Sequence, residues 1–120
     1  MEVEDIKEII EKNPLAFATC DKNNNPHAIA VADVKVISND ELLIGDNYMK
    51  KTIDNIKENS RVSLVVWENL KLSKAGGYEL IGEATYYKEG KYKELIKNIH
   101  RGCPAKGAIV VKINEIKKLA

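Results

Sequence analysis

The sequence lacks most of the features that place a protein in a membrane, an oxidising compartment or a nucleic-acid complex. Its only cysteines are Cys20 and Cys103, and so distant a pair is typical of a reducing compartment. No apolar run approaches the roughly 20 residues that a bilayer-spanning helix needs. Acidic and basic side chains nearly balance, 18 against 19, whereas binding of a phosphate backbone favours a strong basic excess. We therefore expect neither membrane nor nucleic-acid partners.

The composition indicates an ordinary globular protein. The amino-terminal segment MEVEDIKEII is acidic at its front, unlike the basic start of a secretory signal. Hydrophobic residues make up 44% of the chain and charged residues 31%, as in soluble domains. A length of 120 residues suits one domain. We expect residues 1–120 to form a single cytoplasmic domain.

Periodicity and turn residues predict a mainly β fold. Gly82 is expected to mark a β-bulge, and the segment 21–26, DKNNNP, is the strongest turn signal. Doubly wound sheets need a helix for each crossover, so three helices are too few. An antiparallel sheet curled into a small barrel fits better. We expect strands at 15–20, 27–37, 42–45, 61–68, 78–87 and 108–113, and helices at 2–12, 52–59 and 91–100.

One segment has the residues of a phosphate site. Gly45 ends a predicted strand, a polar loop follows, and Lys50, Lys51 and Thr52 stand at the start of a predicted helix. The unpaired N–H groups of a helix start favour a phosphate dianion. The two lysines would add charge, and the Thr52 hydroxyl another donor. Solvated lysines beside a capping threonine would show the same spacing, so both interpretations stay open at this point.

Together with two other segments, this region resembles the FMN-binding split barrels related to pyridoxamine 5′-phosphate oxidase, and the short FMN-binding proteins in particular. The matching segments are AFAT at 16–19 leading to Pro26 and His27, MKKT at 49–52 with Asn55, and GYELIGEA at 77–84. The resemblance extends from Leu15 to Ile113. It implies a six-stranded antiparallel split β-barrel with short flanking helices.

The same resemblance implies a cofactor and an assembly. FMN would be held without a covalent bond between the two subunits of a homodimer. Its phosphate would be bound by Lys50, Lys51 and Thr52. Its ring would lie beside two strands and near a glycine of the partner subunit, which the resemblance places at Ala30, Val31, Ala32, Ile44, Gly45, Asp46 and Gly77.

Two departures from the oxidase pattern limit the implied activity. The strand from His27 lacks the arginine that the oxidase uses for the phosphate, and the chain ends at Ala120 without the oxidase's longer carboxyl-terminal part. We therefore do not expect vitamin B6 synthesis. An oxidoreductase or electron carrier with an unknown donor or acceptor is expected. The alternatives are a flavin-storage module without turnover, a binder of the deazaflavin F420 or of haem, and a barrel that only binds other proteins.

Other chemistry is weakly indicated. His100 and Cys103 have H-x-x-C spacing, and Cys20 and His27 would complete four ligands. The gap between Cys20 and His27 is longer than in ordinary zinc pairs. We therefore expect no metal site and no residue with a catalytic role of its own.

Overall fold

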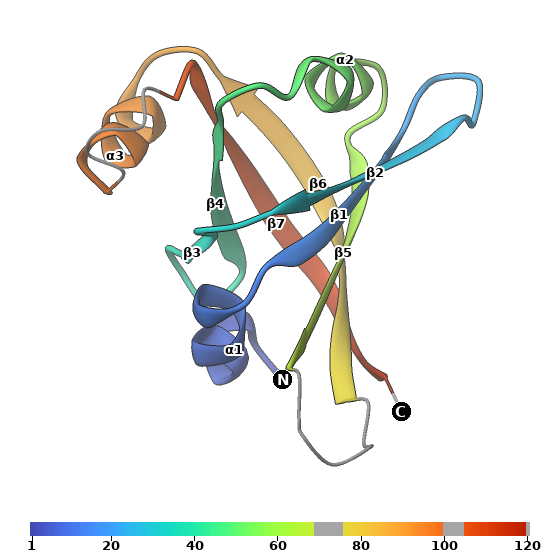
Figure 1. The fold of residues 1–120 in the computed structure, drawn as a ribbon, viewed down its shortest axis with the longest axis vertical. Coiled ribbons are helices and arrows are strands. Elements are labelled where there is room, and N and C mark those ends of the chain that lie inside the picture. The colour runs from blue at the N-terminus through green and yellow to red at the C-terminus, as the bar shows by residue number, and fades with distance from the viewer. Residues whose placement is uncertain (69–75, 100–104, 120) are drawn as a thin grey trace.

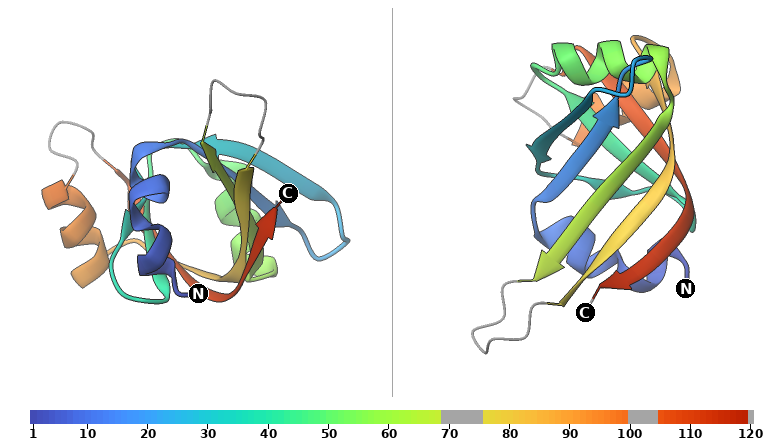
Figure 2. Two further views of the ribbon diagram at one scale, coloured as in Figure 1. Left: turned by 90° about the horizontal axis from the view of Figure 1, so that it is seen from below. Right: turned by 90° about the vertical axis from the view of Figure 1, so that its right-hand side faces the viewer.

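Seven strands form one antiparallel sheet within residues 1–68, 76–99 and 105–119, the parts of the chain that the structure describes. The structure is a computed structural model, and its sheet curls into a barrel (Figures 1 and 2). The elements in chain order are a 3₁₀ helix η1 (Val3–Ile6), α1 (Lys7–Lys12), β1 (Leu15–Cys20), β2 (Pro26–Val31), β3 (Lys35–Val36), β4 (Glu41–Asp46), α2 (Lys50–Glu58), β5 (Arg61–Glu68), β6 (Gly76–Tyr87), α3 (Lys91–Ile99) and β7 (Gly107–Leu119).

The strand order explains why the barrel is split. Neighbouring strands follow the order β2-β1-β5-β6-β7-β4-β3, so β2 and β3 are the edges although they are consecutive in the chain. Every strand pairing among the described residues is antiparallel, as predicted. The predicted class, a mainly β split barrel with short flanking helices, is confirmed.

The number of strands is corrected from six to seven. The single strand expected at 27–37 is wrong, because the chain leaves the sheet after Val31 and pairs again only at Lys35 and Val36. Asp33 between them has a φ of 56°, a left-handed conformation that interrupts extended backbone. The change of direction lets β2 pair with β1 while β3 pairs with β4 on the other side of the split.

Two predicted local features are confirmed. In the turn 21–26, the Asp21 carboxylate accepts hydrogen bonds from the backbone N–H groups of Asn23 and Asn25, and Asn24 is left-handed with a φ of 64°. The β6–β7 pairing shifts register between Ile81 and Gly82. A side chain at Gly82 would overlap the Lys112 carbonyl group, so the bulge requires glycine.

The helices lie where they were predicted, but their first and last residues differ from the predicted ones. The helix expected at 2–12 starts as η1 and continues as α1, while α2 begins two residues before the expected 52. Figure 1 shows α1 and α2 at opposite ends of the barrel and α3 at its side. The last strand runs to Leu119 rather than ending at 113.

The barrel interior is filled by apolar side chains. Along β1, Leu15 and Phe17 are fully buried while Ala16 and Ala18 face outward, the period of two expected for a strand with one buried face. A second, smaller cluster lies under α3, where Ile96 packs with Leu43 and Val110. None of the helices in the described residues is long and apolar enough to cross a membrane.

Candidate functional site around the break in the sheet

The predicted flavin-lining strands border the same break in the sheet. β2 pairs with β1 on one side only, and β4 pairs with β3 only through Leu42 and Leu43. The edge of β4 from Ile44 to Asp46 is therefore free on the side away from β7. Helix α2 follows β4 and packs on β1, β2 and β6. In Figure 1, α2 lies at the top of the molecule, joined by a loop to the upper end of β4.

The side chains of the β2 segment alternate across the sheet. Ala30 and Ala32 are exposed on the outer face, whereas Val31 is buried in the barrel core. A ligand outside the barrel can therefore contact the two alanine side chains, but only the backbone of Val31. Alanine leaves the backbone accessible to a flat ring, because a single methyl group covers little of it.

The β4 residues could contact a bound ring through their backbone rather than through their side chains. Ile44 points into the core, and a side chain at Gly45 would come within 3.2 Å of Ile96 on α3. The resemblance places Gly45 beside the flavin ring. In the structure, α3 occupies the space that a side chain at Gly45 would fill, so packing against α3 accounts for this glycine.

Asp46 links three elements at the end of β4. Its Oδ1 accepts a hydrogen bond from the Met49 N–H at 3.0 Å, and its Oδ2 accepts one from the Tyr86 hydroxyl at 2.7 Å. Its backbone carbonyl accepts a bond from the Lys106 N–H at 2.7 Å. The carboxylate is almost fully buried, so its charge faces the protein interior. Its bond to Met49 holds the loop between β4 and α2 in place.

Tyr86 is a site residue that the sequence did not reveal, since β propensity alone accounts for a tyrosine at the end of a strand. Burial, together with the hydrogen bond to Asp46 and the charge of that carboxylate, raises the pKa of Tyr86 to about 12. In the folded protein this phenol therefore stays protonated at pH values above the ordinary tyrosine pKa of about 10.

The Tyr86→Phe variant should change stability at alkaline pH. The raised pKa stabilises the folded state fully below the unfolded-chain pKa of about 10, and this stabilisation is lost as the pH rises toward about 12. Without the hydroxyl, the free energy of unfolding should fall less steeply over that interval. Urea unfolding at several pH values measures the slope. Tyr48→Phe at a highly exposed ring is the control and should follow the native slope; an unchanged slope in Tyr86→Phe would contradict the assignment.

The first turn of α2 has an unsatisfied donor. No side chain caps this helix, and the side chain of Thr52 is 1% exposed. Its Oγ1 has no hydrogen-bond partner among the described residues. A buried hydroxyl without a partner costs about 1–3 kcal/mol. Such a hydroxyl at a helix start is suited to donate a hydrogen bond to an acceptor atom of a bound ligand.

The two adjacent lysines face different surroundings. The Lys51 ammonium helps to lower the pKa of Asp21, after the larger effect of hydrogen bonds from Asn25, so Lys51 lies toward the β1–β2 turn. Lys50 instead lines a hollow of about 510 Å³ on the other side of α2. We call it the outer hollow, and its residues are Asp46, Lys50, Ile53, Asp54, Lys57, Tyr86, Lys88 and Lys106.

Gly77 lies apart from this region within one chain. It pairs with Trp67 and Leu119, at the end of β6 that is far from α2 (Figure 1). A side chain there would come within 2.7 Å of the Val66 carbonyl oxygen, so close strand packing explains the glycine. Only a second subunit would bring Gly77 near the break in the sheet.

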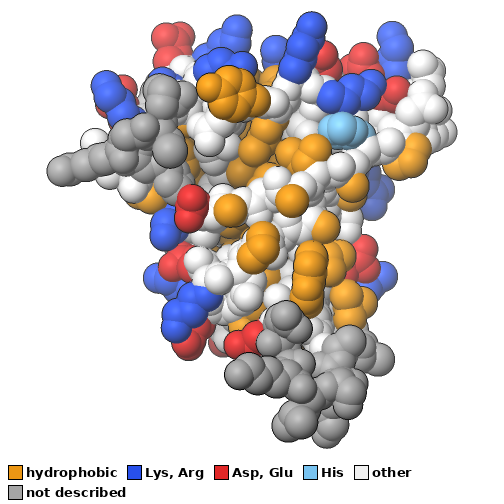
Figure 3. Space-filling model, in the orientation of Figure 1, with side chains coloured by type: hydrophobic (Ala, Val, Ile, Leu, Met, Phe, Trp, Pro, Cys, Tyr) orange, Lys and Arg blue, Asp and Glu red, His pale blue; other side chains and the backbone are white. Residues whose placement is uncertain are grey.

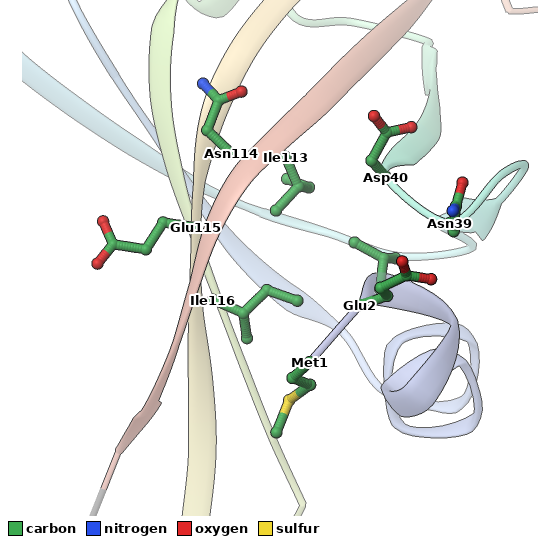
Figure 4. Close-up of a pocket in the computed structure, with 9 residues that line it drawn as sticks. Met1, Glu2, Asn39, Asp40, Ile113, Asn114, Glu115 and Ile116 are labelled. Carbon is green, nitrogen blue, oxygen red and sulfur yellow. The ribbon is translucent and has the colours of Figure 1, made fainter.

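A hollow at the opposite end of the barrel does not suit an anion (Figure 4). Glu2, Asp40 and Glu115 line it together with Met1 and apolar strand residues. In Figure 4 the Glu115 carboxylate points away from the other two. Within the described ranges, no group of three acidic, histidine or cysteine side chains has the geometry of a metal site.

The residues considered for zinc are only partly described. Cys20 is a half-buried free thiol on β1, and His27 is half-buried on β2. His100 and Cys103 lie outside the described residues.

Comparison with known proteins decides the family. Residues 3–120 match the family model described as pyridoxamine 5′-phosphate oxidase. The chain belongs to this family. An uncharacterized protein of Methanocaldococcus jannaschii is 34% identical over 122 residues, an alignment that covers 97% of this chain and 79% of that protein.

Solved structures of the same fold support the assignment to a split barrel. HupZ of Group A Streptococcus superposes with a TM-score of 0.85 at 20% identity, covering 99% of this chain and 94% of that one. An FMN-binding protein of Syntrophomonas wolfei subsp. wolfei gives a TM-score of 0.81 at 20% identity, covering 98% and 86%. This chain therefore shares its fold with a protein described as FMN-binding.

Proposed function

We propose that this chain binds FMN at the break between β2 and β4 and acts as a flavin-dependent oxidoreductase or electron carrier. The observation that carries the proposal is the buried, unpartnered hydroxyl of Thr52 in the uncapped first turn of α2. The FMN-binding relative of the same fold supports flavin as the occupant.

The phosphate of FMN would be held at the start of α2. Free backbone N–H groups and the positive end of the helix dipole favour a dianion there. Lys51 would add a charge from the β1–β2 side, and the Thr52 hydroxyl would donate to a phosphate oxygen. Lys50 would contribute at longer range, because its side chain lines the outer hollow.

The ring would lie against backbone and small side chains. The free edge of β4 at Ile44, Gly45 and Asp46 offers hydrogen-bonding groups, and Ala30 and Ala32 offer a flat surface. When bound, FMN supplies the redox chemistry, and the protein controls its access and potential. The chain's own residues would therefore bind and orient rather than exchange protons.

The homodimer forms part of the proposal. The outer face of β1 and β2 carries four alanines, which we call the alanine face: Ala16, Ala18, Ala28 and Ala30, paired across the strands. Figure 3 shows apolar side chains gathered over this part of the molecule, with lysines concentrated at the α2 end. An apolar surface exposed on a small protein favours association. A partner bound here would bring its Gly77 toward the ring.

Identification of the ligand that accompanies the native protein tests the proposal. We expect yellow protein that releases FMN on denaturation, detected by mass spectrometry in stoichiometric amount. Colourless protein that also fails to take up added FMN would contradict it. Release of F420 or haem instead of FMN would show that the cofactor is a different one. Reoxidation of the dithionite-reduced protein, with and without candidate acceptors, distinguishes an electron carrier from a storage module.

A further inference from the structure

The outer hollow has an excess of positive charge that the rest of the molecule lacks. Four lysines and two aspartates line it, whereas the whole chain carries a net charge of only +1. The lysines come from separate segments: Lys50 and Lys57 lie on α2, Lys88 directly follows β6, and Lys106 directly precedes β7. Their convergence is therefore a property of the fold rather than of a run in the sequence.

These ammonium groups have no acidic partner in the described parts of the chain. The ion pair found there joins Lys12 to Glu8 on α1, far from the hollow. Asp46 is nearly buried, and its two carboxylate oxygens accept bonds from Met49 and Tyr86. The charge of Asp46 is thus directed inward. Asp54 on α2 and the four lysine side chains are exposed, so the solvent-facing part of the hollow carries four positive charges and one negative charge.

Aromatic rings help to position two of the lysines. The Lys57 ammonium lies 5.8 Å from the centre of the Tyr86 ring, and the Lys106 ammonium lies 5.8 Å from the centre of the Tyr48 ring. Tyr48 is 93% exposed and borders the hollow through Lys106. An exposed ring beside basic groups offers a stacking surface for a planar molecule.

We propose that the outer hollow binds a phosphorylated small molecule with a planar base, of nucleotide size, separate from the flavin phosphate. Its volume of about 510 Å³ is in the range of small-molecule sites and exceeds the needs of an inorganic ion. Lysines around a concavity suit a phosphate approached from several sides, whereas paired carboxylate recognition favours arginine. The near-neutral chain disfavours a long nucleic-acid backbone.

Calorimetry with adenosine 5′-diphosphate as the probe tests the site on flavin-saturated protein at low ionic strength. Native protein should bind the probe, and adenosine should bind at least about tenfold more weakly, because loss of one or more charge-assisted hydrogen bonds costs about 1.4 kcal/mol or more. The Lys88→Glu, Lys106→Glu variant should lose at least about tenfold in affinity for the same reason. Neither residue borders the break in the sheet.

The Lys7→Glu, Lys117→Glu variant is the matched control, since both lysines are exposed elsewhere and the net charge changes equally. It should bind the probe like native protein. Absence of probe binding by native protein, equal loss in the control, or displacement of the probe by FMN would each overturn the proposal. Probe binding by a protein that takes up no FMN would sustain this site while contradicting the flavin function.

Discussion

Alanine at both Lys51 and Thr52 is expected to release FMN while the barrel stays folded. Lys51 is exposed, and the Thr52 hydroxyl has no partner to lose, so the substitutions remove no hydrogen bond of the described protein. They would remove two contacts to the phosphate, both charge-assisted because the phosphate is ionised. At about 1.5–3 kcal/mol for each bond to a charged group, the affinity should fall by at least about 10²-fold.

Flavin fluorescence titration measures this loss, and circular dichroism reports the fold. Lys57→Ala is the control, since Lys57 is also exposed on α2 but lines the other side. Thr52→Val adds a stability measurement. Because it removes a buried unsatisfied hydroxyl at nearly constant shape, the flavin-free variant should be at least as stable as native protein. A double alanine variant that retains full FMN would show that the phosphate lies elsewhere.

Arginine at Ala28 should prevent the proposed homodimer from forming. Ala28 is exposed on the alanine face and pairs with Ala18 across the strands. A long charged side chain there would be buried without a partner in any interface formed by this face, which costs several kcal/mol. Light scattering should show a dimeric mass for native protein and a monomeric mass for the variant.

The control for this change is Thr85→Arg, an exposed position of β6 outside the alanine face. It should remain dimeric. If FMN lies between two subunits, Ala28→Arg should also lower flavin affinity although Ala28 is not among the expected flavin contacts. A native protein that is monomeric, or an arginine variant that stays dimeric, would refute an interface on this face.

Local signals made much of the fold predictable from the sequence. A short apolar run identified β1, turn residues identified the segment after it, and an isolated glycine identified the bulge at Gly82. The break after Val31 was not predictable in the same way, because no glycine or proline marks it. Asp33 in a left-handed conformation is a weak signal within an apolar run.

The site was less accessible to sequence reasoning because its contacts are non-local. The phosphate hypothesis came from residues adjacent in sequence, Lys50 and Lys51, yet the helix turns them toward different surroundings. Asp46 and Tyr86 are 40 positions apart, and only the strand pairing around β7 brings them together. Burial of the Thr52 hydroxyl likewise depends on how α2 packs.

The bulge opposite Gly82 changes which residues of β7 face inward. Gly82 pairs with Ile113 and Ile81 with Glu115, so Asn114 has no opposite residue. As a result Ile113 and Ile116 both pack against the core although they are three positions apart. Without the bulge, strict alternation through Asn114 would turn Glu115 toward the barrel interior and Ile116 toward solvent. The one extra residue therefore keeps a charged side chain out of the core, and any substitution that abolished the bulge at constant length would reverse both faces of the strand's last part.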